Sequence, residues 1–220
     1  MKKNYLKLTG LSLAIALLIS SCMPEGETPM TSEAAKLANE VADAGNHEIG
    51  GENFRKGPNG VFYQEKFSNS IGIFPDEGFT EEFPFPAFYP GTGVGNATYM
   101  GKAYSFINQR AEFGPQGPVT VGAPVTMFFA EQLADEFGLT NIPDEVSSLT
   151  TDGKGNTIYF KNILNVTTPV SETRINFTAD VEIIGGTGKF ETASGMGKVV
   201  GFFNPGNGAG ETTLRATIVF

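Results

Sequence analysis

The fold is decided by the stretch INFTADVEII at residues 175–184, which is followed by GGTGKF at 185–190 and ASGMG at 193–197. Apolar and polar side chains alternate along residues 175–183, which is typical of a strand with one buried and one solvated face. The glycines at 185–188 end this strand, because glycine accepts the positive φ that turns require. Two more strands are predicted, at Lys198–Phe203 and over residues 214–220, with a turn at 204–208 between them.

The segment from Gly185 to Gly197 resembles the glycine-rich hairpin of allene oxide cyclase-like and dirigent-like β-barrels. The earlier stretch GNATYMGK, at 95–102, resembles a strand of bacterial members of that group, with Tyr99 where a histidine is expected. The resemblance touches about 40 residues. It implies an eight-stranded antiparallel β-barrel, often assembled as a homotrimer, but no activity, since this fold hosts cyclases and non-catalytic proteins alike.

Composition excludes several classes of protein. The chain has 220 residues, enough for one domain with a substantial core, and a formal net charge of −9. An acidic chain without a basic run is unsuited to binding nucleic acid. Cys22 is the single cysteine and His47 the single histidine, so an internal disulfide and a cysteine metal cluster are excluded. We expect no metal site and no cofactor.

The N-terminus has the pattern of a bacterial lipoprotein signal. Lys2 and Lys3 precede an apolar segment at 11–19 that is too short to span a bilayer, and small residues stand directly before Cys22. The pattern resembles a lipobox, which implies that Cys22 is acylated and becomes the new N-terminus; an ordinary signal peptide cut elsewhere, or a buried anchor, is the alternative. We therefore expect a lipoprotein of the cell envelope, in the outer membrane of a Gram-negative bacterium.

Beyond Cys22, the sequence predicts a tether over residues 23–30, a helix over 31–45 and a β-barrel domain over 46–220. The helix follows from an apolar stripe at Ala34, Leu37, Ala38 and Val41. The stripe would lie against the barrel or plug one end; binding a partner helix is the alternative.

The region from Phe74 to Pro90 is rich in proline and aromatic residues, which argues against a regular helix or a central strand. One interpretation is a long loop that packs its aromatic side chains on the barrel. The other is an aromatic lid over the barrel mouth or an exposed recognition loop. The candidate ligand-binding residues are Phe83, Phe85, Phe88, Tyr89, Tyr99 and Tyr104.

Several further elements are predicted along the chain. Val61–Ser68 is a strand, and Ala97–Asn108 is a strand with a small face that would allow a helix or a neighbouring subunit to approach closely. Thr126–Phe137 is a second, short helix ended by Gly138, although 119–129 could instead continue as a strand. Residues 151–156 form a hairpin turn and only superficially resemble a calcium loop.

Three hypotheses of function follow. The first is a lipid-anchored envelope β-barrel that binds an apolar small molecule or has a structural role, without catalytic residues. The second is an enzyme of the allene oxide cyclase or isomerase type, for which Glu65, Glu182 and Glu191 are candidates for a buried carboxylate. The third is a homotrimeric interaction module. An interior with one buried carboxylate and water would favour the enzyme. A solid core would favour a structural role, and an open apolar cavity would favour ligand binding.

Overall fold

The computed structural model describes residues 60–80, 85–114 and 117–220, and β-strands predominate among them. The strands are β1 (Val61–Ile71), β2 (Phe74–Pro75), β3 (Ala87–Phe88), β4 (Gly91–Ala97), β5 (Gly101–Ile107), β6 (Gln109–Gly114), β7 (Gly117–Gly122), β8 (Ser148–Thr151), β9 (Thr157–Ser171), β10 (Arg174–Thr187), β11 (Ser194–Phe203) and β12 (Ala209–Val219). The helical elements in these ranges are α2 (Thr126–Phe137) and the 3-10 turn η3 (Gly188–Phe190). The helix predicted over 31–45 lies outside the described residues.

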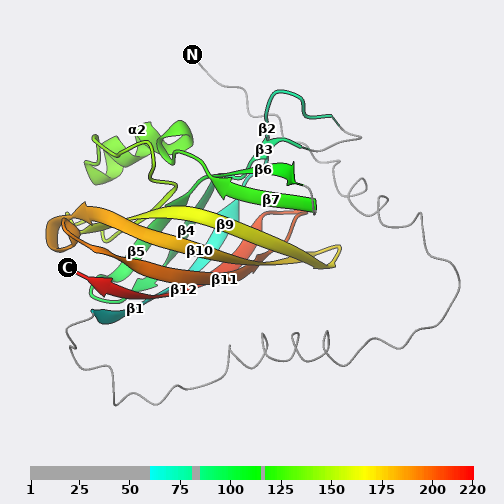
Figure 1. Cartoon of the computed structure of the whole chain (residues 1–220). Coiled ribbons are helices and arrows are strands. Elements are labelled where there is room, and N and C mark those ends of the chain that lie inside the picture. The colour runs from blue at the N-terminus through cyan, green and yellow to red at the C-terminus, as the bar shows by residue number, and fades with distance from the viewer. Residues whose placement is uncertain (1–59, 81–84, 115–116) are drawn as a thin grey trace, which may run out of the picture.

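Eight of the strands close into an antiparallel barrel (Figure 1). Their order is β10–β11–β12–β1–β4–β5–β8–β9, and β9 also pairs with β10. The closed eight-stranded antiparallel barrel confirms this part of the predicted fold. Closure removes the free edges at which strands of different chains would otherwise pair.

The short strands β2, β3, β6 and β7 extend the same wall beyond one end of the closed ring. The long strand β9 pairs first with β8, through Thr157 to Phe160, and further along with β7, through Asn165 and Val166. Only Asn108 separates β5 from β6, so these two act as one interrupted strand. On the neighbouring strand position, β7 pairs with β6 and β8 pairs with β5, with α2 inserted between β7 and β8. Apart from β2 and β3, which branch off between β1 and β4 and lie beyond β6, the wall is a meander of sequence neighbours.

Alternation directs the apolar side chains of the strands into the interior of the barrel. On β10, Phe177, Ala179, Val181 and Ile183 are all buried, as the period-2 pattern predicts. They belong to, or adjoin, one packed cluster inside the barrel. Its members are Tyr63, Phe67, Ala97, Ala103, Ile158, Phe160, Val181, Ile183, Phe190, Ala193, Leu214, Ala216 and Ile218.

Helix α2 packs on the outside of the barrel (Figure 1). Its Leu133 is fully buried, and Phe129 and Phe137 both contact the ring of Phe106 on β5. Gly138 ends the helix in the left-handed region, with φ of 68°. The predicted helix and its stop are confirmed, and the alternative of a strand through 119–129 is wrong because β7 ends at Gly122.

Two predicted segments differ in the structure. Ala97–Asn108 is not one strand: residues 98–100 turn the chain between β4 and β5, with Tyr99 at φ 67° and Gly101 at φ 72°. The proline-rich region is not wholly irregular, because Phe74 and Ala87–Phe88 form short bridges at the edge of the sheet. Proline is tolerated at such an edge, since no central ladder needs its missing N–H.

Candidate functional site

Glu65 lies inside the barrel, on β1, and only 5 % of its surface is exposed. The alternation of β1 places it between Tyr63 and Phe67 on the inner face, and the neighbouring strands present Ala97 and Leu214 beside it. Among the described residues it is the one buried carboxyl group, and no lysine, arginine or histidine is buried there. A carboxyl group in that position is costly unless it is protonated or well hydrogen-bonded.

Two hydroxyl groups bind the Glu65 carboxyl. The Tyr63 hydroxyl donates a hydrogen bond of 2.6 Å to Oε1, and the hydroxyl of Thr150 on β8 donates another. Burial raises the pKa of Glu65 to about 7, although both hydrogen bonds act in the opposite direction. Burial also raises the pKa of the Tyr63 hydroxyl, so that this group remains a donor.

Small residues on β4 and β5 leave room for this contact across the barrel. Ala97 and Ala103 face the interior, and β4 and β5 separate β1 from β8 along the wall. At Gly93, an added Cβ would collide with the side chains of Asn69 and Ser105. The small face predicted over Ala97–Asn108 is thus occupied within the barrel, whereas the bulky face with Tyr104 and Phe106 lies under α2.

A second polar group faces the interior at the end of the barrel where β6, β7 and β9 meet. We call Gln109, Thr120, Asn162 and Asn165 the inner amide cluster. Oε1 of Gln109 accepts hydrogen bonds from the Thr120 hydroxyl (2.8 Å) and from Nδ2 of Asn165 (2.7 Å). Asn162 and Asn165 stand opposite Val181 and Ala179, which face the interior, so they face it as well. Nδ2 of Asn162 and Oδ1 of Asn165 are buried and have no hydrogen-bond partner among the described residues.

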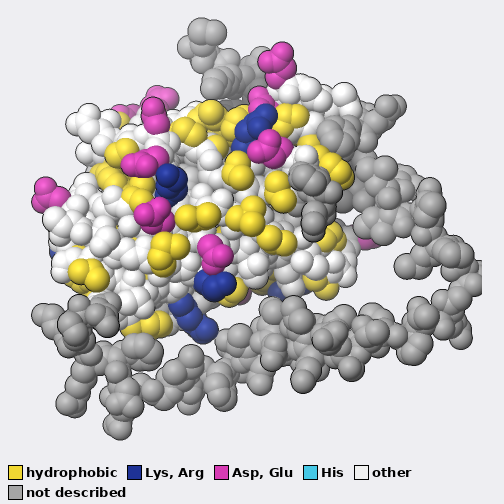
Figure 2. Space-filling model, in the orientation of Figure 1, with side chains coloured by type: hydrophobic (Ala, Val, Ile, Leu, Met, Phe, Trp, Pro, Cys, Tyr) yellow, Lys and Arg dark blue, Asp and Glu magenta, His cyan; other side chains and the backbone are white. Residues whose placement is uncertain are grey.

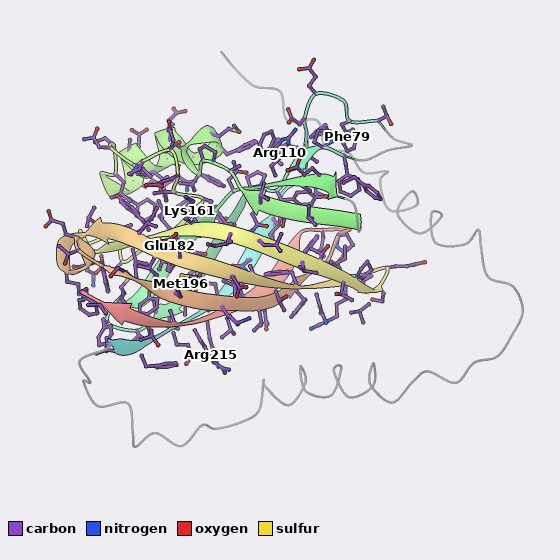
Figure 3. The ribbon with its side chains drawn as sticks, in the orientation of Figure 1. Phe79, Arg110, Lys161, Glu182, Met196 and Arg215 are labelled. Atoms are coloured by element: carbon purple, nitrogen blue, oxygen red, sulfur yellow. The ribbon has the colours of Figure 1, made fainter. Side chains whose placement is uncertain are left out.

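The two other candidate carboxylates lie on the surface. Glu182 is on the outer face of β10, between Lys161 and Met196 on the adjacent strands, as Figure 3 shows. Glu191 is exposed just after η3. Of the three carboxylates predicted as candidates, only Glu65 is therefore inside the barrel.

The described aromatic candidates contact different partners. Phe85 contacts Phe113, Phe88 contacts Phe128 of α2, and Tyr89 contacts Phe203 near one end of the barrel. Tyr99 is 48 % exposed and contacts Phe220, while Tyr104 packs against Phe137 under α2. Phe83 lies outside the described residues. The structure does not gather the other five at one pocket, and the packing of Phe88 and Tyr89 agrees with the loop-on-barrel interpretation.

The residues predicted as a hairpin turn do form one between β8 and β9. The Asp152 carboxylate accepts hydrogen bonds from the backbone N–H groups of Lys154 and Asn156 and from Nδ2 of Asn156. Its oxygens therefore hold the turn. Within the described ranges, no three Asp, Glu, His or Cys side chains gather in a way that could hold a metal ion.

The outer surface offers a groove of about 440 Å³ over β12, β1 and β4, with Lys66 and Glu211 among its lining residues. Elsewhere on the surface, apolar side chains are interspersed with charged ones over β9–β11 (Figure 2). We regard the interior as the stronger candidate site, because a perturbed carboxyl group and unpartnered amide atoms are found there.

Comparison of the chain with protein-family models, with curated proteins and with solved structures found no match. No helix in the described part of the chain is both long and apolar enough to cross a membrane. What the fold and the interior define is a class of protein: a closed eight-stranded antiparallel β-barrel in whose described residues a single carboxyl group is buried.

Proposed function

We propose that this protein is a lipid-anchored component of the bacterial cell envelope whose barrel binds an apolar small molecule, with Glu65 as the polar anchor. The observation that carries the proposal is the burial of Glu65 among apolar side chains, where it costs stability. A fold that needed only a packed core would be more stable with an apolar residue at this position. The retained carboxyl group is therefore best explained by an interaction with a ligand.

The anchor is proposed from the lipobox-like segment ending at Cys22, which lies outside the described residues. Homotrimeric assembly is proposed from the resemblance to allene oxide cyclase-like barrels. Exposed apolar side chains on the outer wall, such as Val166 on β9 and Val200 on β11, support a further contact surface there.

Native mass spectrometry of the mature chain, released from membranes in detergent, tests the proposal. We expect a retained apolar small molecule whose occupancy falls in Glu65→Gln and is unchanged in Glu182→Gln, the control on the outer face. A ligand-free wild-type protein would contradict ligand binding and favour a structural role. The same spectra give the oligomeric state.

A second candidate function is isomerisation by proton transfer, and it is favoured by the pKa of Glu65 near 7. A carboxylate with that pKa can remove a proton from carbon and return it elsewhere on the same molecule, which balances without a cofactor. In D2O, the retained ligand would then exchange carbon-bound hydrogen for deuterium. Exchange that is lost in Glu65→Gln would establish the enzyme, and no exchange in the wild type would leave binding alone.

A further inference from the structure

Glu65 and two members of the inner amide cluster, Asn165 and Thr120, belong to one continuous row of paired residues around the barrel. From Glu65 the row passes through Leu214, Val199 and Ala179 to Asn165, and then to Thr120 on β7. Four strand steps separate Glu65 from Asn165, and half of an eight-stranded ring is also four steps. The two residues therefore lie on opposite walls of the barrel. Because strands in such barrels are tilted, they are also on the order of 10 Å apart along its axis.

The amide of Asn165 is held in a fixed orientation. Its Nδ2 donates to Oε1 of Gln109, which the Thr120 hydroxyl holds at the same time. This bond leaves Oδ1 of Asn165 as a buried acceptor without a partner, while Nδ2 of Asn162 is a buried donor without one. Asn162 and Asn165 are only 7 % and 6 % exposed. An unpartnered buried donor or acceptor costs about 1–3 kcal/mol, so both atoms would gain from a bound polar group.

The charge of the interior restricts what that group can be. No lysine, arginine or histidine is buried among the described residues, and the one buried carboxyl group there is that of Glu65. An anionic head group would find no cation and would be repelled by ionised Glu65. A neutral group that both donates and accepts matches the free donor of Asn162 and the free acceptor of Asn165.

We propose that the inner amide cluster binds one polar end of the barrel's ligand, across the interior from the part held by Glu65, and that this end is a neutral hydrogen-bonding group such as an alcohol or a primary amide. The inference rests on the proposed function, since it specifies the ligand of the same interior. It assigns Asn162 and Asn165 as residues that determine the specificity for the head group.

The test compares probes that share one six-carbon chain: hexanamide, hexan-1-ol and hexanoate. Each is titrated at pH 8 into the full-length chain in detergent, and binding is followed by calorimetry. We expect hexanamide and hexan-1-ol to bind at least tenfold more tightly than hexanoate. Asn165→Leu and Asn162→Leu, which keep the branching and the number of side-chain heavy atoms, should each weaken hexanamide binding at least fivefold.

The matched control is Asn176→Leu, because Asn176 lies on the outer face of β10 and binds Arg174 there. It should leave binding of hexanamide unchanged. Two results would overturn the head-group inference while leaving ligand binding by the barrel intact. One is that hexanoate binds as tightly as hexanamide; the other is that Asn162→Leu and Asn165→Leu both bind hexanamide with the affinity of the wild type. If none of the three probes binds, ligand binding by the barrel fails as well, and ordered water is then the partner of the two amide atoms.

Discussion

The hydroxyl of Tyr63 lies 2.6 Å from Oε1 of Glu65, two residues further along β1, and both side chains are inside the barrel. Each group changes the chemistry of the other. The donated hydrogen bond lowers the pKa of Glu65 against the larger effect of burial, and the nearby carboxylate raises the pKa of Tyr63. The pair is therefore a buried acid whose protonation is coupled to the stability of the barrel.

The free energy of unfolding should decrease as the pH rises from about 4.5 to 7. The folded state holds a proton on Glu65 up to a pKa of about 7, whereas the unfolded chain releases it near 4.5. Between these values the folded state binds more protons, so Glu65 lowers the stability by about 3 kcal/mol across the interval. Denaturant unfolding at pH 4.5 and pH 8 measures this difference.

Glu65→Gln should remove that part of the pH dependence, because glutamine has no proton to lose. The variant should match the wild type near pH 4.5 and be more stable than it at pH 8. Glu182→Gln, on the outer wall, is the control and should retain the wild-type profile. An unchanged profile in Glu65→Gln would show that another group is responsible.

Tyr63→Phe should destabilise the protein more at pH 8 than at pH 5. At pH 8 the Glu65 carboxyl is mainly ionised and loses a charge-assisted hydrogen bond, which costs about 1.5–3 kcal/mol; at pH 5 the lost bond is neutral and costs about 1 kcal/mol. The substitution also removes an interaction that lowers the pKa of Glu65, so the pKa should rise further. Denaturant unfolding of Tyr63→Phe, Glu65→Gln and the double variant gives the coupling energy, and a value near zero would contradict the proposed pairing.

Much of the barrel could be predicted from the sequence, because alternation is a local property. The pattern at 175–183 and the helix at 126–137 appear in the structure essentially as predicted. The prediction failed at residues 98–100, where a tyrosine occupies a left-handed turn that glycine or asparagine would have signalled. The sequence also could not predict whether the small face of Ala97–Asn108 points into the barrel or toward a helix or another subunit. Small side chains allow any of these to approach closely.

The candidate site was only partly predictable. Val61, Tyr63 and Phe67 share one face of the strand with Glu65, and Gln64, Lys66 and Ser68 lie on the other. Glu65 therefore occupies an otherwise apolar face, and this signal distinguishes it from Glu182. The inner amide cluster had no such signal. Gln109, Thr120 and Asn165 come from three strands, and only the register of β6, β7 and β9 brings them together. Amide side chains in strands are otherwise typical of a solvated face.

Phe190→Ala should destabilise the protein by about 3–5 kcal/mol, since this ring is fully buried and its removal leaves a cavity. Phe190 projects from η3 into the interior cluster, where it contacts Tyr63 edge to face at 6.2 Å between ring centroids. Val219→Ala, at a half-exposed position on β12, should change the stability by less than about 0.5 kcal/mol. Equal effects of the two substitutions in denaturant unfolding would show that η3 does not close the core.

Cys22→Ala should abolish membrane attachment of the mature protein. Acyl chains contribute about 0.8 kcal/mol for each buried CH2 group, so several chains on one residue make a firm anchor, and alanine cannot carry them. Fractionation of cells should show an unprocessed precursor or a soluble protein, and mass spectrometry of the wild-type N-terminus should show acylation. Ser21→Ala, which keeps a small residue before Cys22, is the matched control and should be processed and anchored normally. A Cys22→Ala protein that is cleaved normally and stays with the membrane would refute the lipid anchor and would place attachment elsewhere in the chain.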